Sequence, residues 1–76
     1  MPTWEIYVNG RVQGVGFRYF VWKAATELGI KGYVQNQWDG KVKIVAQAEE
    51  HTLHTFQIIV AQGNRYAFVK ELKINK

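Results

Sequence analysis

The sequence predicts an α+β fold with the element order β-α-β-β-α-β. Three observations support this order. Apolar and polar residues alternate near both ends of the chain and in its middle, as they do in half-buried strands. Two other stretches repeat apolar residues at helical spacing. Glycines, or an Asp-Gly pair, separate the segments where turns are needed.

The first half of the chain gives a strand, a helix and a second strand. Residues 4–10 alternate between apolar and polar side chains, which indicates a strand. Residues 17–28 have one apolar helical face, and Gly29 is a natural helix end. Residues 32–36 are predicted to form a short second strand. The apolar positions are Trp4, Ile6 and Val8 in the strand and Phe17, Val21, Ala24, Ala25 and Leu28 in the helix.

A third strand and a second helix follow. The pair Asp39-Gly40 is typical of a hairpin turn, and residues 41–47 alternate basic and apolar side chains. The second helix is predicted to end at Gly63. Its β-branched run, residues 58–60, would also suit a strand, so this element has two interpretations. The apolar face of the helix consists of Leu53, Phe56 and Val60.

Residues 66–74 form the predicted fourth strand. Their apolar positions change register between Val69 and Leu72, which indicates a β-bulge. The complete order is the split βαβ arrangement called ferredoxin-like, with two helices on one face of a four-stranded antiparallel sheet. Because this fold serves many unrelated functions, function has to be argued from a site.

Length and composition indicate one folded domain, residues 1–76. A chain with 47% hydrophobic and 21% charged residues has enough apolar side chains for one core. The absence of cysteine excludes a disulfide framework, a thiolate metal site and a cysteine nucleophile. A net charge of +4 favours anionic partners. No signal-peptide pattern or membrane-spanning stretch is present, so we expect a cytoplasmic monomer without a membrane partner.

The segment Gly14-Val15-Gly16-Phe17-Arg18 lies between the first strand and the first helix. Glycines allow a tight turn that leaves backbone amides accessible, and the start of a helix carries unpaired N–H groups and partial positive charge. Arg18 adds a planar cation that can bind a phosphate through two hydrogen bonds. This junction is therefore a candidate phosphate site, although the five residues alone would also fit a structural turn with a solvated arginine.

Two longer motifs resemble those of the acylphosphatase family. Residues 8–18, VNGRVQGVGFR, resemble the first motif of the family, and residues 32–40, GYVQNQWDG, resemble the second. Both occur in the family's order and at its usual separation, and the likeness runs through nearly the whole chain. The resemblance implies a small hydrolase that cleaves the carboxyl–phosphate bond of acyl phosphates and releases a carboxylate and inorganic phosphate.

The resemblance also implies a role for each site residue. Arg18 would bind the phosphoryl group together with the loop amides, and Asn36 would hold the attacking water. A carboxylate leaving group has a pKa of about 4, so it needs no general acid. We expect a small acyl phosphate as substrate and no cofactor, metal or nucleic acid. The catalytic residues are then Arg18 and Asn36, and the substrate-binding residues are Gln13, Gly14, Val15, Gly16, Phe17 and Arg18.

The chain departs from the family pattern in three respects. Ala48 stands where relatives usually carry a glycine, and Gly63-Asn64-Arg65 replaces a connection that is typically rich in proline. The chain is also shorter than most family members. None of these departures touches Arg18, Asn36 or the glycine loop, so they bear on stability and substrate range more than on chemistry.

Several other residues invite a functional interpretation. His51 and His54 have a spacing that suits a metal, but without a third ligand nearby we expect surface histidines. Trp38 is predicted either to wall the substrate pocket or to cover the edge of the core. Core or core-edge positions are predicted for Trp4, Phe20, Trp22 and Phe56, and solvent-facing positions for Lys41 and Lys43.

Three alternatives remain open at this stage. RNA-recognition domains share the β-α-β-β-α-β order, but their exposed aromatics lie on the two central strands, and residues 41–47 contain none. Related domains also occur inside larger maturation proteins that use carbamoyl phosphate. The last alternative is a catalytically weak relative that is retained for binding.

Overall fold

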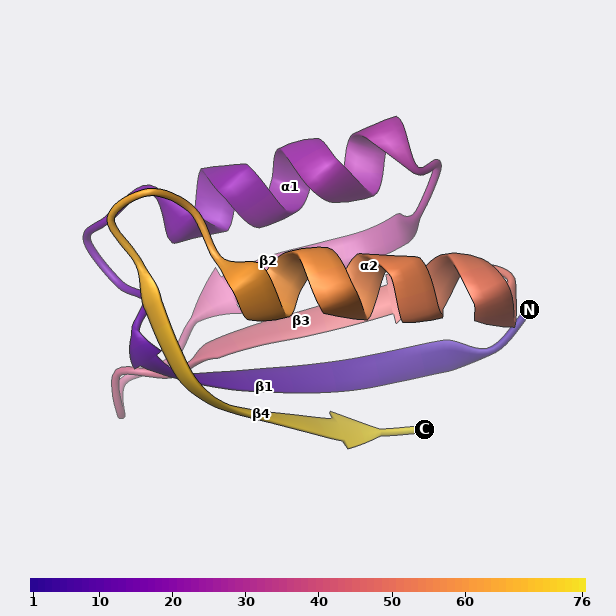
Figure 1. Ribbon diagram of the computed structural model, residues 1–76. Helices are drawn as coiled ribbons and strands as arrows, with labels where there is room; N and C mark the ends of the chain where they lie inside the picture. The colour runs from indigo at the N-terminus through magenta and orange to yellow at the C-terminus, as the bar shows by residue number, and fades with distance from the viewer.

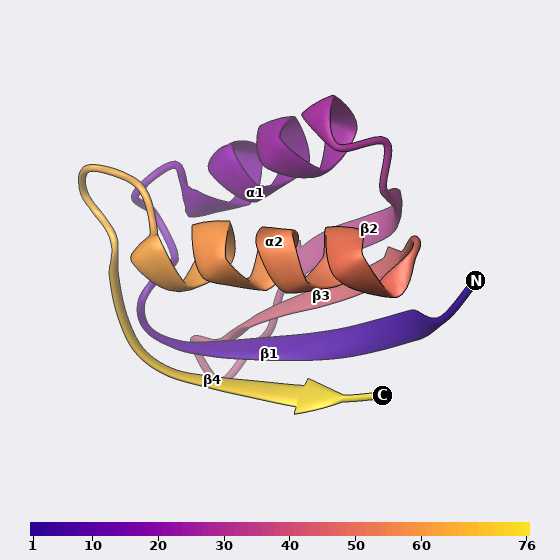
Figure 2. The same cartoon turned by 45° about the vertical axis from the view of Figure 1, so that its right-hand side comes forward.

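The computed structural model describes residues 1–76 as a four-stranded antiparallel sheet with both helices packed on one face (Figure 1). The expected element order is confirmed, and the segment with two interpretations is a helix. The view in Figure 2 shows the two helices side by side above the sheet. The elements are β1 (Thr3–Arg11), α1 (Phe17–Glu27), β2 (Lys31–Asn36), β3 (Val42–Gln47), α2 (Glu50–Gln62) and β4 (Phe68–Asn75).

The strand order is β2-β3-β1-β4. Both β1 and β2 pair antiparallel with β3, so β1 and β2 run in the same direction. Their C-terminal ends therefore lie at the same edge of the sheet. Figure 1 shows the loop after β1, the start of α1 and the β2–β3 turn together at this edge.

The core lies between the sheet and the helices and contains no buried polar or charged residue. Opposite partners on the central strands, such as Ile6 and Ile44, point to this core. Helix α1 buries Phe17, Val21 and Ala24 at the helical spacing seen in the sequence. The whole core consists of Trp4, Ile6, Val8, Val12, Phe17, Val21, Ala24, Val42, Ile44, Ala46, Ala48, Leu53, Phe56 and Val60.

Two strands begin later than the sequence predicts, whereas β1 and β2 are slightly longer than predicted. Strand β4 begins at Phe68 rather than Tyr66, because the Ala67 N–H donates to the Asn64 carbonyl over 3.2 Å and closes a turn first. Strand β3 begins at Val42, so Lys41 belongs to the hairpin turn, where its N–H donates to Asp39 Oδ1 over 3.0 Å. Local hydrogen bonds thus shorten both strands.

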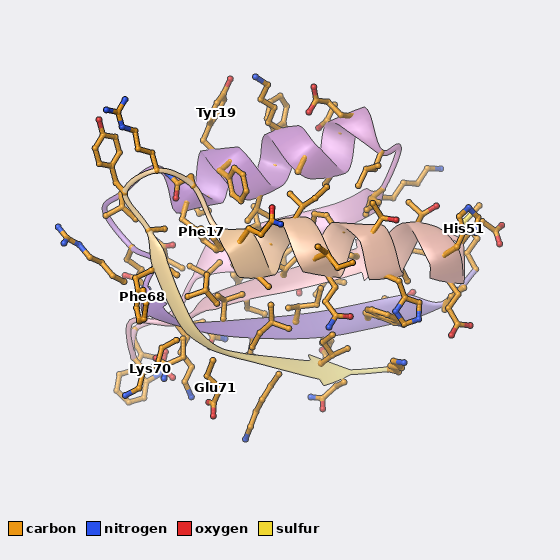
Figure 3. All side chains as sticks on the ribbon, in the orientation of Figure 1. Phe17, Tyr19, His51, Phe68, Lys70 and Glu71 are labelled. Carbon is orange, nitrogen blue, oxygen red and sulfur yellow. The ribbon has the colours of Figure 1, made fainter.

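The predicted bulge in β4 is confirmed. Asn9 pairs with Glu71, whereas the next residue, Gly10, pairs with Val69, so Lys70 is the extra residue between the two pairs. Figure 3 shows Lys70 and Glu71 at this point of β4. A bulge increases the local twist of a strand. Gly10 opposite the bulge has φ of 136°, which favours glycine.

Two tryptophans are more exposed than predicted. The prediction that Trp22 lies in the core or at its edge is wrong, because it is 55% exposed and directly follows the buried Val21 on α1. The interpretation of Trp38 as a cover for the core edge is also wrong, because its side chain is 99% exposed. Trp4 and Phe56 are buried, and Phe20 packs against the core, as expected.

The polar residues predicted at the surface lie there. His51 is exposed in the first turn of α2, far from the β1–α1 loop (Figure 3). His54 is also exposed and packs edge-on against Trp4, with 5.1 Å between ring centroids. Lys43 lies on the sheet face away from the helices, 3.8 Å from Glu5 Oε2. Tyr33, and then Tyr7, raise the pKa of Lys43 because a phenolate nearby favours the ammonium form.

The bulge makes a stability prediction at Gly10. A Cβ at this position would collide with the Phe68 carbonyl oxygen and lie 2.7 Å from the Lys70 nitrogen. We expect Gly10→Ala to lower the free energy of unfolding by about 2–3 kcal/mol, measured by urea denaturation. Gly40→Ala is the control, because Gly40 also has a positive φ but no atom within 4 Å of an added Cβ. It should cost only about 1 kcal/mol; equal losses would contradict the steric explanation.

Candidate active site

The loop between β1 and α1 is held open by its glycines. Gly14 and Gly16 have φ of 72° and 76°, and Gly16 is the residue immediately before α1. Its carbonyl accepts the first helical hydrogen bond, from the Phe20 N–H, at 3.1 Å. No side chain caps this end of α1. The glycines therefore turn the chain into the helix and leave its first N–H groups free.

The N–H groups of residues 13–18 have no acceptor within the protein. Those of residues 13–16 lie outside any strand or helix and donate to no backbone or side-chain group. Phe17 and Arg18 begin α1, and no helical carbonyl precedes them. Six consecutive amides at the positive end of a helix favour an anion with several oxygen atoms. We call residues 13–18 the phosphate loop.

A cleft of about 300 Å³ opens beside the phosphate loop. It brings Arg18 from α1 together with Asn36 from the end of β2, and both side chains are exposed. This meeting follows from the parallel directions of β1 and β2. The residues that line the cleft are Val12, Gly14, Gly16, Phe17, Arg18, Tyr19 and Asn36.

Two of the predicted substrate-binding residues do not line this cleft. The Gln13 side chain turns to the β2–β3 hairpin, where Nε2 donates to the carbonyls of Gln37 over 2.7 Å and Lys41 over 2.9 Å. The carbonyl of Val15 accepts a hydrogen bond of 2.8 Å from Asn64 Nδ2. Only the backbone N–H groups of Gln13 and Val15 remain available to a ligand.

Sequence reasoning missed two residues at the site. Asn64 was visible only as a departure from the family pattern, and the loop contact that it makes depends on tertiary structure. Tyr19 lines the cleft and is 66% exposed, and its ring lies 5.8 Å from the Trp22 ring. Figure 3 shows Tyr19 pointing away from the sheet and Phe17 pointing inward. An exposed aromatic on a helix carries no signal of a binding role in the sequence.

Other parts of the molecule offer less for polar chemistry. A smaller cavity of about 110 Å³ between α1 and the β2 edge of the sheet is mostly apolar, with Lys31 as its single charged residue. No group of three or more His, Cys, Asp or Glu side chains lies together. Neither helix has the length and hydropathy of a membrane span. The cleft at the phosphate loop is therefore the best candidate for an active site.

The split βαβ order, with two helices on one face of a four-stranded antiparallel sheet, places the chain in the ferredoxin-like class of small α+β proteins. The family model described as Acylphosphatase matches residues 4–76. The chain thus belongs to the acylphosphatase family, and it is an enzyme that hydrolyses acyl phosphates.

Known relatives agree with this assignment. An acylphosphatase from Archaeoglobus fulgidus is 54% identical over 76 residues, which are 100% of this chain and 85% of the relative. The crystal structure of the Bacillus subtilis acylphosphatase superposes with a TM-score of 0.97 at 40% identity, covering 99% of this chain and 83% of that one. The crystal structure of T. kodakarensis HypF is similar over a small part of its length, with a TM-score of 0.88, 32% identity and coverage of 100% of this chain and 10% of that one.

The Asn64 contact makes a pH-dependent prediction. Asn64 Oδ1 is buried without a partner, so Asn64→Asp would bury a carboxylate and place an oxygen against the Val15 carbonyl. We expect a loss of about 2–3 kcal/mol at pH 7, measured by urea denaturation. Burial should raise the folded-state pKa of this carboxyl above its unfolded value of about 3.9. The variant should therefore regain stability relative to wild type as pH falls through the raised pKa, and lose it as pH rises.

The matched control is Asn64→Ala, which removes the hydrogen bond without adding a charge. It should cost about 1 kcal/mol at both pH 4 and pH 7. Equal stability of the two variants at pH 7 would contradict a buried site for the Asn64 side chain.

Proposed function

We propose that the phosphate loop and Arg18 bind the phosphoryl group of an acyl phosphate and that Asn36 orients the water that attacks it. One observation carries this proposal: Arg18, the loop glycines and Asn36 line the same cleft although the rest of α1 and the length of β2 separate Asn36 from the loop in sequence. The phosphorus atom would then lie between the free amides on one side and the Asn36 amide on the other.

The positive charge at the phosphate loop favours binding of a phosphoryl group there. The free N–H groups and the dipole of α1 offer positive potential, and the first turn of α1 contains no acidic residue to oppose an anion. The guanidinium of Arg18, which lines the cleft, can donate hydrogen bonds to two phosphoryl oxygens at once. Phosphoryl transfer needs positioning and charge stabilisation more than covalent help from the protein, which suits a site without a nucleophilic side chain.

The side-chain amide of Asn36 is suited to orienting the attacking water. Asn36 can accept a hydrogen bond from water and donate one to a phosphoryl oxygen at the same time. A carboxylate at this position would repel the incoming phosphate. The departing carboxylate is a weak base, so the reaction proceeds without a general acid. Water attacks phosphorus, the bond from phosphorus to the acyl oxygen breaks, and the products are a carboxylate and inorganic phosphate.

We further propose that residues 1–76 act as one monomeric domain in the cytoplasm, without a nucleic-acid partner. Higher identity and TM-score to the Bacillus subtilis enzyme than to HypF support a role like that of the small acylphosphatases. Of the two central strands, β3 presents Lys43 and Val45 on the open sheet face and no aromatic ring, and β1 presents a single one, Tyr7, in register with Lys43. RNA-recognition domains stack bases on aromatic rings from both central strands, so this face offers less for RNA. These features leave acyl phosphate hydrolysis as the better account.

Arg18 should be far more sensitive than other surface arginines. We expect Arg18→Ala to lower kcat/KM for an aryl acyl phosphate by about 10³-fold or more, and Arg18→Lys to rescue little, because lysine lacks the two-pronged geometry. Arg11→Ala and Arg65→Ala are the controls, since both side chains are exposed outside the cleft. Wild type should not hydrolyse a phosphate monoester assayed in parallel. Equal losses at all three arginines would mean diffuse attraction of anions and no specific site.

Asn36 should affect turnover rather than binding. We expect Asn36→Ala to lower kcat by about 10²–10³-fold, the effect of losing one preorganised polar group. KM, and the competitive inhibition constant of inorganic phosphate, should stay within about twofold because the phosphate loop and Arg18 are intact. Asn36→Asp should be no better than Asn36→Ala. Full kcat with a raised KM would instead make Asn36 a substrate-binding residue.

A further inference from the structure

The sheet joins the two halves of the candidate site only through β3, where Val8 of β1 and Asn36 of β2 both pair with Val42. The phosphate loop follows β1, Asn36 ends β2, and β3 lies between these strands. No backbone ladder therefore runs directly from β1 to β2. The phosphate loop lies beyond the last β1–β3 pair, Val8 with Val42, so a contact from the loop itself to the β2–β3 hairpin would fix its distance from the Asn36 amide. A misplacement of about 1 Å in such a site can cost about 10²-fold in rate.

The Gln13 side chain makes this contact. It leaves the phosphate loop, and its Nε2 donates one hydrogen bond to the Gln37 carbonyl at 2.7 Å and one to the Lys41 carbonyl at 2.9 Å. Gln37 is the residue immediately after Asn36. Both N–H bonds of the Gln13 amide are thus used on the hairpin that carries Asn36.

The two acceptors belong to the bonds that close this hairpin. The Lys41 carbonyl also accepts from the Gln37 N–H over 2.8 Å, and the Gln37 carbonyl also accepts from the Gly40 N–H over 3.1 Å. Each carbonyl has two lone pairs, and both are then occupied. The Gln13 side chain is half-buried, which shields these bonds from exchange with water. Neither carbonyl can then accept a further hydrogen bond, and only a side chain with two N–H donors can make both contacts.

We propose that Gln13 is a positioning residue that fixes the phosphate loop relative to Asn36 through its side-chain amide. This inference rests on the roles proposed above for Arg18 and Asn36. Gln13 contributes to the site in two separate ways: its backbone N–H belongs to the phosphate loop, and its side chain holds the hairpin.

Two substitutions of similar size test the side-chain role. Gln13→Met removes both donors, and Gln13→Glu also turns a carboxylate toward two carbonyl oxygens. We expect kcat for an aryl acyl phosphate to fall by about 10-fold in Gln13→Met and about 10²-fold in Gln13→Glu at pH 7. KM and the inhibition constant of inorganic phosphate should change less than about twofold, because the loop amides and Arg18 are untouched.

The pH profile distinguishes positioning from a general loss of structure. The carboxyl in Gln13→Glu should have a pKa above the ordinary value of about 4.3, since it is half-buried and faces carbonyl oxygens. Its protonated form regains one donor, so the activity of this variant relative to wild type should rise as pH falls. Gln13→Met should show a constant ratio. The charged residues of the hairpin, Asp39 and Lys41, are present in all three proteins, so their own effect on activity cancels in the ratio. On the introduced carboxyl they act in opposite directions, since Asp39 raises its pKa and Lys41 lowers it.

Gln35→Glu is the matched control. It makes the same chemical change on β2, but Gln35 is exposed and pairs in register with Lys43, away from the hairpin contact. We expect its kcat to remain within about twofold of wild type, since an exposed charge has little effect.

A double-mutant cycle with Asn36→Ala closes the test. If Gln13 acts through Asn36, Gln13→Met should cost almost nothing further once Asn36 is removed. Independent, multiplying losses would overturn the inference while leaving the role of Asn36 intact, as would an unchanged kcat in both Gln13 variants. A loss confined to KM and phosphate inhibition would also overturn it. If Asn36→Ala alone had no effect on kcat, the proposed function would fail, and that outcome is visible in the same cycle.

Discussion

The site depends on the antiparallel pairing of both β1 and β2 with β3. This pairing forces β1 and β2 to run parallel, and a parallel connection requires a crossover, which α1 supplies. The loop after β1 and the end of β2 therefore meet at one edge of the sheet, at the start of the crossover helix. An apolar core without a buried polar or charged residue holds this arrangement, and two core residues, Val12 and Phe17, reach the lining of the cleft.

The phosphate loop combines local freedom with tertiary restraint. Its own amides make no hydrogen bonds within the protein, which leaves them available to an anion but gives the loop no internal stability. Two side-chain amides restrain it from outside: Gln13 reaches the hairpin, and Asn64 from the α2–β4 connection reaches the Val15 carbonyl. Because these contacts use the carbonyl and side-chain groups of the loop, they leave its N–H groups free. Side-chain contacts thus restrain residues 13–18 while the backbone N–H groups of these residues stay unpaired.

The electrostatics of the cleft are simple. Positive potential comes from the helix start and Arg18, and no acidic residue lies in the first turn of α1 or in the cleft lining. No group of three or more His, Cys, Asp or Glu side chains lies together in the structure. For a leaving group as weakly basic as a carboxylate, positioning and charge are the main requirements of the reaction.

The sequence by itself determined the element order, a bulge between Val69 and Leu72, the family and the candidate pair Arg18 and Asn36. These follow from local periodicity, turn chemistry and motif, each of which is written within a few neighbouring residues. Tertiary structure decided what depends on distant partners: the exposure of Trp22 and Trp38, and the contacts of Gln13 and Asn64. The sequence does not show whether the side-chain amide of a glutamine or asparagine binds water or donates to a carbonyl many residues away. Only the folded chain brings that carbonyl within hydrogen-bonding distance.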